Sequence, residues 1–314
     1  MFIGTAASTP TRGRGLPATL VRRGGDQLLF DCGEGTQRQL LRSIGLVDLE
    51  EIFVTHFHAD HFLGLPGMLK TFALRGRETP LTIYGPPGLR ALFAALRPVV
   101  GGTAYRVHLV ELEPNSPLER DGYLVAPFPV EHRAPAYGYV LVEDDRPGRF
   151  DEERARELGV EPGPDFGRLQ AGEAVSVDGR EVLPEQVLGE PRRGRKLVLT
   201  GDTVPTETTR AIAHGADLLV HEATFASEEA ERAAETGHST ARGAAQLAAA
   251  AEVALLALTH VSPRYGPDEL RAEAREVFDA TIVPRDFDRV EIPFPERGGP
   301  VHVKAQRGTA AGGC

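Results

Sequence analysis

Short apolar runs alternate with stretches of helical periodicity along most of the chain. Compact runs rich in β-branched and aromatic residues predict strands at 20–21, 27–31, 51–55, 81–84, 107–111, 123–128, 137–142, 197–200, 217–221, 253–259 and 290–292. Apolar residues at helical spacing predict helices at 36–43, 89–96, 208–214, 228–236, 241–251 and 268–280. Hairpin-like pairs of strands in the first half indicate packed sheets flanked by helices, rather than a simple doubly wound sheet.

Residues 143–195 interrupt this alternation. The segment is polar, has 14 acidic and 9 basic residues, and shows little apolar periodicity. It is too long for an ordinary loop, so it is either a disordered insertion or a functional protrusion, and its composition favours a surface insertion that adds little to the core. The last predicted strand is followed by residues rich in Pro, Gly and Arg. We therefore expect one domain over 1–292, interrupted by 143–195, and a flexible tail over 293–314.

Length and charge narrow the class of protein. The 314 residues suit one large α/β domain or two modest ones. The most apolar stretch, 247–261, contains Glu252, and the N-terminus lacks a basic region followed by an apolar run, so we expect neither a membrane span nor a signal peptide. Cys32 and Cys314 cannot make a disulfide framework, which favours a cytoplasmic protein. The net charge of −10 argues weakly against a nucleic-acid partner.

The sharpest chemical signal is the run Thr-His-Phe-His-Ala-Asp-His at 55–61, directly after a predicted strand. His56 and His58 alternate, so both can point to one side of an extended strand end. Asp60 and His61 follow as the chain turns into a helix. Four imidazole and carboxylate groups within six residues suit zinc or a similar divalent ion.

Three further candidate ligands follow later strands. Asp202 comes after the strand ending at 200, His260 after the strand ending at 259, and His132 after the strand 123–128. Taken singly, Asp202 could form an Asx turn or cap a helix, and each histidine could be structural. Taken together with the first cluster they make seven ligands, enough for two open metal sites. Two neighbouring metals are suited to activating water for hydrolysis, and the Asp202 carboxylate could bridge them.

This pattern resembles the metallo-β-lactamase fold, an α/β four-layer αββα sandwich, which hosts lactamases, thioesterases of the glyoxalase II kind, phosphodiesterases and nucleases. Finer motifs resemble ribonuclease Z, the family of tRNA 3′-processing endoribonucleases. These motifs are FDCGEGTQ at 30–37, HFHADHFLGLPGML at 56–69, LTGDT at 199–203, HEATF at 221–225, HST at 238–240 and LTHVSPRY at 258–265. They occur in the family's order, and the resemblance runs from Gly4 to about Ile292.

The resemblance implies two Zn²⁺ per subunit, or a similar divalent ion such as Mn²⁺. One zinc would be held by His56, His58, His132 and Asp202, and the other by Asp60, His61, Asp202 and His260. Asp60 would also orient or deprotonate the attacking water. His238 and Glu222 would assist proton delivery to the leaving 3′-oxygen, which fits an imidazole held by a carboxylate.

Several of these residues also have a purely structural interpretation. Glu222 could be a carboxylate at a helix N-terminus, and His238 could cap a helix beside Ser239. Cys32 is read as a small buried residue rather than a nucleophile. Asp31 and Glu34 could be turn residues or could support the metal ligands, and the sequence does not decide between these roles.

The insertion resembles the protruding arm with which this family grips the tRNA elbow. Gly163 and Pro164 match the arm's Gly-Pro motif, and with Arg168 they are the candidate substrate-binding residues. The segment carries a net charge of −5, so any grip on phosphate must come from a subset of its basic residues. The candidates are Arg168, Arg192, Arg193, Arg195 and Lys196. The resemblance also implies a homodimer in which one subunit's arm serves its partner's active site.

The leading hypothesis is a zinc-dependent endoribonuclease that removes 3′ trailers from precursor tRNA, leaving a tRNA 3′-hydroxyl and a 5′-phosphate trailer. One alternative is a small-molecule phosphodiesterase or thioesterase on the same dizinc fold, against which the arm and the HEAT and HST motifs argue. The other is a metal-bound RNA-binding module with weak catalysis, against which the full ligand set argues.

Overall fold

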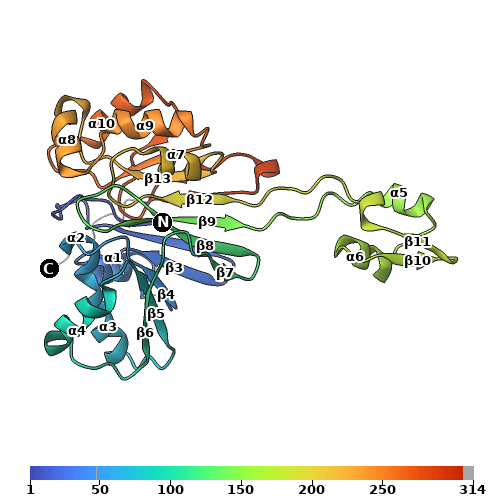
Figure 1. The fold of residues 1–314 in the computed structure, drawn as a ribbon, viewed down its shortest axis with the longest axis horizontal. Helices are drawn as coiled ribbons and strands as arrows, with labels where there is room; N and C mark the ends of the chain where they lie inside the picture. The colour runs from blue at the N-terminus through green and yellow to red at the C-terminus, as the bar shows by residue number, and fades with distance from the viewer. Residues whose placement is uncertain (47, 307–314) are drawn as a thin grey trace.

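The computed structural model describes residues 1–46 and 48–306, which form four layers: helices, two facing sheets and helices again (Figure 1). The first sheet has six strands in sequential order. Its strands are β1 (Phe2–Gly4), β2 (Ala18–Arg23), β3 (Asp26–Phe30), β4 (Glu51–Phe53), β5 (Leu81–Gly85) and β6 (Val107–Glu111). From β3 to β6 the strands are parallel, so their carboxyl ends lie along one edge.

The second sheet has seven strands in the order β15-β14-β13-β12-β9-β8-β7. Its strands are β7 (Leu118–Arg120), β8 (Tyr123–Pro129), β9 (Tyr137–Glu143), β12 (Lys196–Leu199), β13 (Leu218–Glu222), β14 (Leu256–Thr259) and β15 (Thr281–Ile282). The four strands from β12 to β15 are parallel, whereas β7, β8 and β9 form antiparallel hairpins. Loops that follow parallel strands meet at the carboxyl edge, where open α/β sheets place their ligands.

Helices cover the outer face of each sheet. The first sheet is covered by α1 (Thr36–Ser43), α3 (Gly64–Leu74) and α4 (Leu89–Val100). The second is covered by α7 (Glu207–Ala213), α8 (Ala230–Thr236), α9 (Ala241–Ala250) and α10 (Pro267–Arg275), with the short turn η2 (Ser227–Glu229). Alanines line the buried face of α9, and their small side chains let it approach β13 and β14 closely.

Besides the apolar contacts between each sheet and its helices, an apolar core lies between the two sheets, where Phe30, Phe53 and Tyr139 pack together. The expected αββα sandwich is therefore confirmed. The predicted strands and helices recur with shifted ends. The last predicted helix, for example, ends at Arg275 instead of residue 280, and β15 begins at Thr281. Helix α3 and the strands β7 and β15 were not predicted. None of the helices in the described residues is both long and apolar enough to span a bilayer.

Residues 143–195 form an arm that extends from the body (Figure 1). It contains α5 (Glu152–Glu157), α6 (Pro164–Gln170), β10 (Val175–Val177), β11 (Arg180–Val182) and the turn η1 (Pro184–Gln186). A small core of its own includes Ala155, Leu169 and Val187. The arm begins where β9 ends and finishes where β12 begins, as the polar composition predicts. The segment is ordered, so the disordered alternative is wrong; its elements are too short to produce a readable periodicity.

The expectation of a flexible tail from residue 293 is wrong for residues 293–306. Strand β17 (Val301–Val303) pairs antiparallel with β16 (Arg289–Glu291), after the turn η3 (Pro295–Arg297). His302 Nε2 lies 2.9 Å from Asp288 Oδ2, and the Phe2 amide of β1 donates to the Asp288 carbonyl oxygen at 2.9 Å, so Asp288 ties this hairpin to the body. Pro and Gly were read as a sign of disorder, whereas here they shape the turn between two strands. Residues 307–314 lie outside the described part of the chain.

Candidate metal centre and active site

All seven predicted ligands come together in the cleft at the carboxyl edges of the two sheets. The loop after β4 presents His56 and His58, and the short helix α2 (Ala59–Phe62) presents Asp60 and His61. From the second sheet come His132 after β8, Asp202 after β12 and His260 after β14. The cluster therefore joins the two halves of the sandwich.

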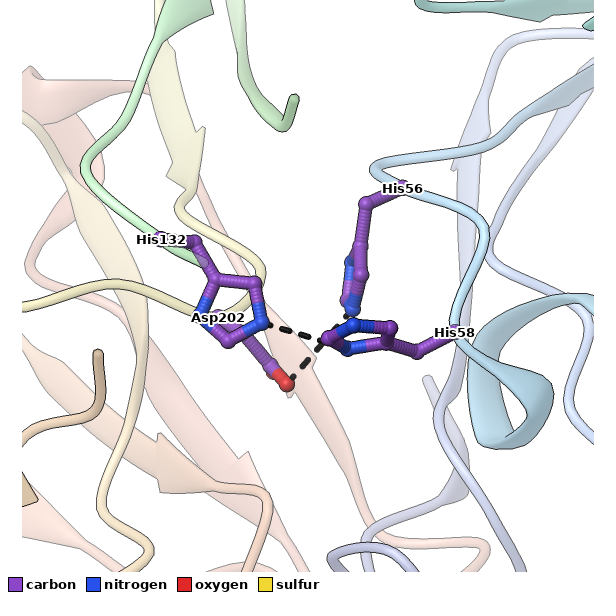
Figure 2. A group of neighbouring side chains, drawn as sticks. All are labelled: His56, His58, His132 and Asp202. Carbon is purple, nitrogen blue, oxygen red and sulfur yellow. Dashed lines mark hydrogen bonds and ion pairs between the residues drawn. The ribbon is translucent and has the colours of Figure 1, made fainter. Parts of the chain in front are cut away.

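The first group is His56, His58, His132 and Asp202, whose ligand atoms all lie within 4.8 Å of one another. Figure 2 shows the four side chains pointing toward a common centre, His56 and His58 from one loop and His132 and Asp202 from two others. His132 Nε2 is 3.2 Å from His58 Nδ1, and His56 Nε2 is 3.8 Å from Asp202 Oδ2. Ligand atoms of a tetrahedral zinc site lie ~3.3 Å apart, so these spacings suit such an ion.

The second group is Asp60, His61 and His260. His260 Nε2 lies 3.3 Å from Asp60 Oδ2 and 3.3 Å from Asp202 Oδ2. His61 Nε2 lies 3.4 Å from Asp202 Oδ1. Asp202 is thus adjacent to both groups, the position that a bridging carboxylate requires.

Buried atoms without partners test whether a metal fits here. Nε2 of His56, Nε2 of His61 and Oδ1 of Asp202 are buried and have no hydrogen-bond partner within the described residues. An orphaned buried polar atom destabilises a fold by about 1–3 kcal/mol, so such atoms normally have a partner. Imidazole and carboxylate donors that converge on one point fit divalent cations of the zinc type.

The other ring nitrogen of several ligands is held by a second group. His61 Nδ1 lies 2.7 Å from Asp31 Oδ2, and His132 Nδ1 lies 2.7 Å from the carbonyl oxygen of Gly237. His260 Nδ1 lies 2.8 Å from the hydroxyl of Thr224. Such partners orient a ring and leave Nε2 free to bind metal.

Sequence reasoning left Asp31 undecided and missed the other two supports. Asp31 follows β3 with a φ of 59°, and it also accepts a hydrogen bond from the Thr55 amide at 2.8 Å. It is therefore a support for His61. A carbonyl and a hydroxyl leave no pattern in a sequence, so Gly237 and Thr224 could not have been identified. Glu34 is exposed and does not belong to the ligand cluster.

The pKa shifts of the clustered side chains favour the binding of cations. Burial lowers the pKa of His56 well below its usual value, which keeps the ring neutral. Burial also disfavours a charge on His61, but the carboxylates of Asp202 and Asp31 outweigh burial and raise its pKa. Burial would raise the pKa of Asp202, yet the surrounding imidazoles hold it well below its usual value. The carboxylates of Asp31 and Asp202 thus favour a positive charge at this centre, and a metal ion bound to His61 would take the place of its proton.

His238 and Glu222 form a pair beside this cluster. His238 Nδ1 is 2.7 Å from Glu222 Oε1, and Glu222 also accepts hydrogen bonds from the Thr203 amide at 2.9 Å and the Thr224 hydroxyl at 2.6 Å. Burial lowers the pKa of His238, but the bond to Glu222 outweighs it and the net shift is upward. Neither residue is a helix cap: Glu222 ends β13, and Thr240 caps α9.

His238 could also be considered a metal ligand, since it lies near Asp202 and His260. Its Nδ1 is 3.9 Å from Asp202 Oδ2, farther than from Glu222, and binding metal through Nδ1 would break the bond to Glu222. The geometry therefore favours a ring held by Glu222 that presents Nε2 outward.

A cavity of about 310 Å³ opens beside His238. Phe225 lines it, as do the two cations Arg232 and Arg264. Ser8 also lines the cavity, and its amide donates a hydrogen bond of 2.9 Å to Asp60 Oδ2. The cavity thus extends from the proposed proton donor to two arginines that share one carboxylate, that of Glu229.

The arm candidates are not part of this cluster. Gly163 and Pro164 are exposed at the start of α6, and Arg168 forms ion pairs with Asp165 and Glu173. The four other basic candidates lie at the arm's base and are also engaged. Arg192 pairs with Glu296, Arg193 with Asp217 and Arg195 with Glu143, while Lys196 Nζ donates to the His214 carbonyl. The structure thus gives none of these five as a free phosphate-binding group.

Cys32 is fully buried, and burial raises the pKa of its thiol. A buried thiol that stays protonated is a poor nucleophile. The reading of Cys32 as a packing residue is therefore confirmed.

Comparisons with known proteins identify the family of this chain. Residues 12–171 match the family model of the metallo-beta-lactamase superfamily. Ribonuclease Z of Haloferax volcanii is 49% identical over 304 residues, covering 95% of this chain and 96% of the relative. Ribonuclease Z of Myxococcus xanthus is 48% identical, covering 93% and 97%. The crystal structure of human tRNase Z, short form, superposes with a TM-score of 0.68 at 28% identity, covering 93% of this chain and 98% of that one. The chain therefore belongs to the ribonuclease Z family, endoribonucleases that hydrolyse phosphodiester bonds on a metallo-β-lactamase fold.

Proposed function

We propose that this protein removes 3′ trailers from precursor tRNA with two zinc ions, leaving a tRNA 3′-hydroxyl and a 5′-phosphate trailer. The observation that carries the proposal is the ligand cluster with its unpaired buried atoms, set beside the His238–Glu222 pair. Relatives named ribonuclease Z, such as two that are 49% and 48% identical over 95% and 93% of the chain, support the choice of substrate.

The seven ligands would hold the two ions, with Asp202 between them. When bound, the ions supply positive charge that offsets the charge developing on the phosphoryl oxygens, and they make water more acidic. Asp60 would orient the attacking water and accept its proton. Its Oδ2 is fixed by the Ser8 amide and faces His260, so the carboxylate has little freedom to turn away.

His238 would donate a proton from Nε2 to the leaving 3′-oxygen. Glu222 favours the protonated ring and holds its orientation through Nδ1. The nucleoside that leaves with that oxygen would then occupy the cavity beside His238. Arg232 and Arg264 line this cavity and share the single carboxylate of Glu229, so together they keep one net positive charge that could pair with a backbone phosphate.

The arm would hold the part of the tRNA distant from the cleavage site. It leaves the body where β9 ends and β12 begins, whereas Asp202 follows the other end of β12 (Figure 1). An arm that starts at the end of the sheet opposite the metal centre favours service to a second subunit. We therefore propose a homodimer with arms acting across subunits, working in the cytoplasm where tRNA is processed.

The direct test is cleavage of a precursor tRNA by purified, zinc-loaded protein, with both product ends mapped. We expect one cut after the acceptor stem, a 3′-hydroxyl on the tRNA and a 5′-phosphate on the trailer. Parallel precursors with and without an encoded CCA would define the accepted substrate. A zinc-loaded protein that hydrolyses small diesters but leaves every precursor intact would favour the small-molecule phosphodiesterase instead.

A further inference from the structure

The connection between the arm and the body is narrow. Two antiparallel segments form this stalk, held by backbone hydrogen bonds such as those between Arg146 and Arg192, each 2.8 Å. Gly148 and Gly189 lie so close that a Cβ on Gly148 would be 1.9 Å from the Gly189 carbonyl oxygen. An isolated two-stranded ribbon is marginally stable at best. Another element must therefore hold the stalk if the arm is to keep one direction.

The C-terminal segment that was expected to be flexible contacts the base of this stalk. Two guanidinium groups lie against the aromatic ring of Phe294, with Arg146 at 3.5 Å and Arg195 at 4.5 Å from the ring centroid. Both distances are within the ~6 Å range of cation–π attraction. Figure 1 shows the short turn η3 beside the point where the stalk leaves β12.

Glu296 adds a two-pronged ion pair. Arg146 donates from Nη1 to Oε1 at 2.9 Å and from Nη2 to Oε2 at 2.8 Å, and Arg192 Nη1 lies 3.3 Å from Oε1. Arg146 and Arg192 face each other across the stalk, so the single carboxylate pairs with both cations and reduces their mutual repulsion. A bidentate pair fixes direction as well as distance, because the guanidinium is planar and rigid.

We propose that Phe294 and Glu296 form an arm clamp, which fixes the direction in which the arm leaves the body and thereby positions substrate for cleavage. The fixed direction of the arm is a matter of the molecule's shape alone. The positioning of substrate rests on the proposed function, since it assumes that the arm holds tRNA. The clamp residues touch neither the metal cluster nor the cavity beside His238, so they are positioning residues rather than catalytic ones.

The ion pair stays charged across the physiological range. The hydrogen bonds from Arg146 lower the pKa of Glu296 to about 2. Because the pKa is depressed, the pair is fully formed above the ordinary carboxyl pKa and is lost only as the pH falls toward 2. Removing the charge by substitution is therefore a cleaner test than changing the pH.

The experiment combines two variants with a control on the same hairpin. Glu296→Gln keeps the shape but removes the charge, and Phe294→Leu keeps an apolar side chain but removes the aromatic ring. The control is Glu291→Gln, which removes an exposed ion pair with Arg289 that does not contact the stalk. Unchanged hydrolysis of a nitrophenyl phosphodiester in each variant would establish that the body is folded and metal-loaded.

The direct readout is the distance distribution between two spin labels, one on the arm and one on the body. Ser176→Cys on β10 and Thr208→Cys on α7 offer exposed positions, in a Cys314→Ser background where only buried Cys32 remains. We expect both clamp variants to broaden the distribution, and the control to match the parent. An unchanged distribution in Glu296→Gln and Phe294→Leu together would overturn the clamp.

The second readout is precursor-tRNA cleavage. We expect each clamp variant to raise KM by ~10-fold or more with a smaller effect on kcat, because a misdirected arm weakens productive placement of the substrate. A broadened distribution with unchanged KM would overturn the substrate-positioning half of the proposal. If the parent protein itself fails to cleave precursor tRNA, the proposed function fails, while the label distances still decide whether the clamp exists.

Discussion

At the scale of single residues, the proposed proton transfer by His238 can be tested separately from the role of the metal ligands. Its ring is held by a buried carboxylate that also receives hydrogen bonds from Thr203 and Thr224, so the pair is rigid and fully partnered on the Glu222 side. A ribose 3′-oxygen is a poor leaving group and needs a proton, whereas a nitrophenolate leaves without one. The two kinds of substrate therefore report on different residues.

We expect His238→Ala to slow precursor-tRNA cleavage by ~10²–10⁴-fold, the usual contribution of a general acid. Hydrolysis of a nitrophenyl phosphodiester should remain close to the parent rate. Burial lowers the pKa of His238, but the hydrogen bond to Glu222 outweighs it and raises the pKa above its usual value, so the acid form persists to higher pH than in a free imidazole and is lost as the pH rises through the raised pKa. The alkaline limb of the precursor profile should accordingly disappear in the variant.

The matched control is His108→Ala, which removes an exposed histidine from β6 outside the cleft. It should leave both rates unchanged. Equal slowing of both substrates by His238→Ala, at normal metal content, would mean that the residue supports the metal centre instead of donating the proton.

Asp31 gives a second prediction at this scale. It holds His61 through a 2.7 Å contact, so Asp31→Asn should leave the fold intact but weaken metal binding by about 10–100-fold, the typical effect of losing a group that orients a ligand. Competition with a chelating dye would measure the change. The control is Asp26→Asn, which alters a carboxylate bonded to the Tyr123 hydroxyl away from the cleft. Equal affinity in the Asp31→Asn and parent proteins would remove Asp31 from this role.

At the scale of elements, the metal ligands were predicted best where a candidate ligand directly follows a recognisable strand. His56 and His58 follow a short β-rich run, and Asp202 and His260 follow strands of the second sheet. Parallel strands deliver such residues to one edge, which is why local patterns predicted a long-range cluster correctly. Asp31 could not be resolved, because its role depends on a partner 30 positions away in the sequence.

Some strands could not be predicted from the sequence for a different physical reason. Strands β10 and β11 have three residues each, too few for alternation to be distinguished from chance. They form because they pair with each other over the arm's own core. The pairing of β17 with β16 likewise depends on tertiary contacts of Phe294 and His302, which composition does not encode.

The arm is an element that can be removed cleanly. Gly189 donates its amide hydrogen to the Arg149 carbonyl at 2.9 Å, so the two stalk segments are already adjacent there. Replacing residues 150–188 with an Asn-Gly turn should leave the body and the arm clamp in place. We expect precursor-tRNA cleavage to be lost and nitrophenyl phosphodiester hydrolysis to persist, since that substrate is too small to reach the arm. Loss of both activities in a folded, metal-loaded variant would make the segment structural.

At the scale of the whole molecule, the metal centre connects the two sheets. His56, His58, Asp60 and His61 follow the first sheet, whereas Asp202 and His260 follow strands of the second. We expect about two divalent ions per chain by elemental analysis, and a lower unfolding temperature after chelation. A ligand present at 100 times its dissociation constant stabilises the folded state by ~2.7 kcal/mol.

The pH dependence of that stabilisation follows from His61. Its raised pKa favours a proton in the metal-free protein, and this proton competes with the metal. The difference in unfolding temperature between metal-loaded and metal-free protein should therefore shrink as the pH falls. His58→Ala should lose one ion and nearly all activity, with His108→Ala as its control. A single ion per chain in zinc-saturated parent protein would contradict the two-metal centre.

In a dimer, an arm could act on the active site of its own chain or on that of the partner. Because the arm leaves the end of the second sheet opposite Asp202, we expect it to act on the active site of a partner. Two defective proteins should then complement each other: the armless chain has an intact site, and full-length His238→Ala has an intact arm. After subunit exchange at equal concentrations, precursor cleavage should recover to roughly a quarter of the parent rate, since half of the dimers are mixed and each has one competent site. An arm that acts on its own chain would give no recovery, because no single polypeptide in the mixture has both parts. Sedimentation of the parent as a fully active monomer would exclude the arrangement independently.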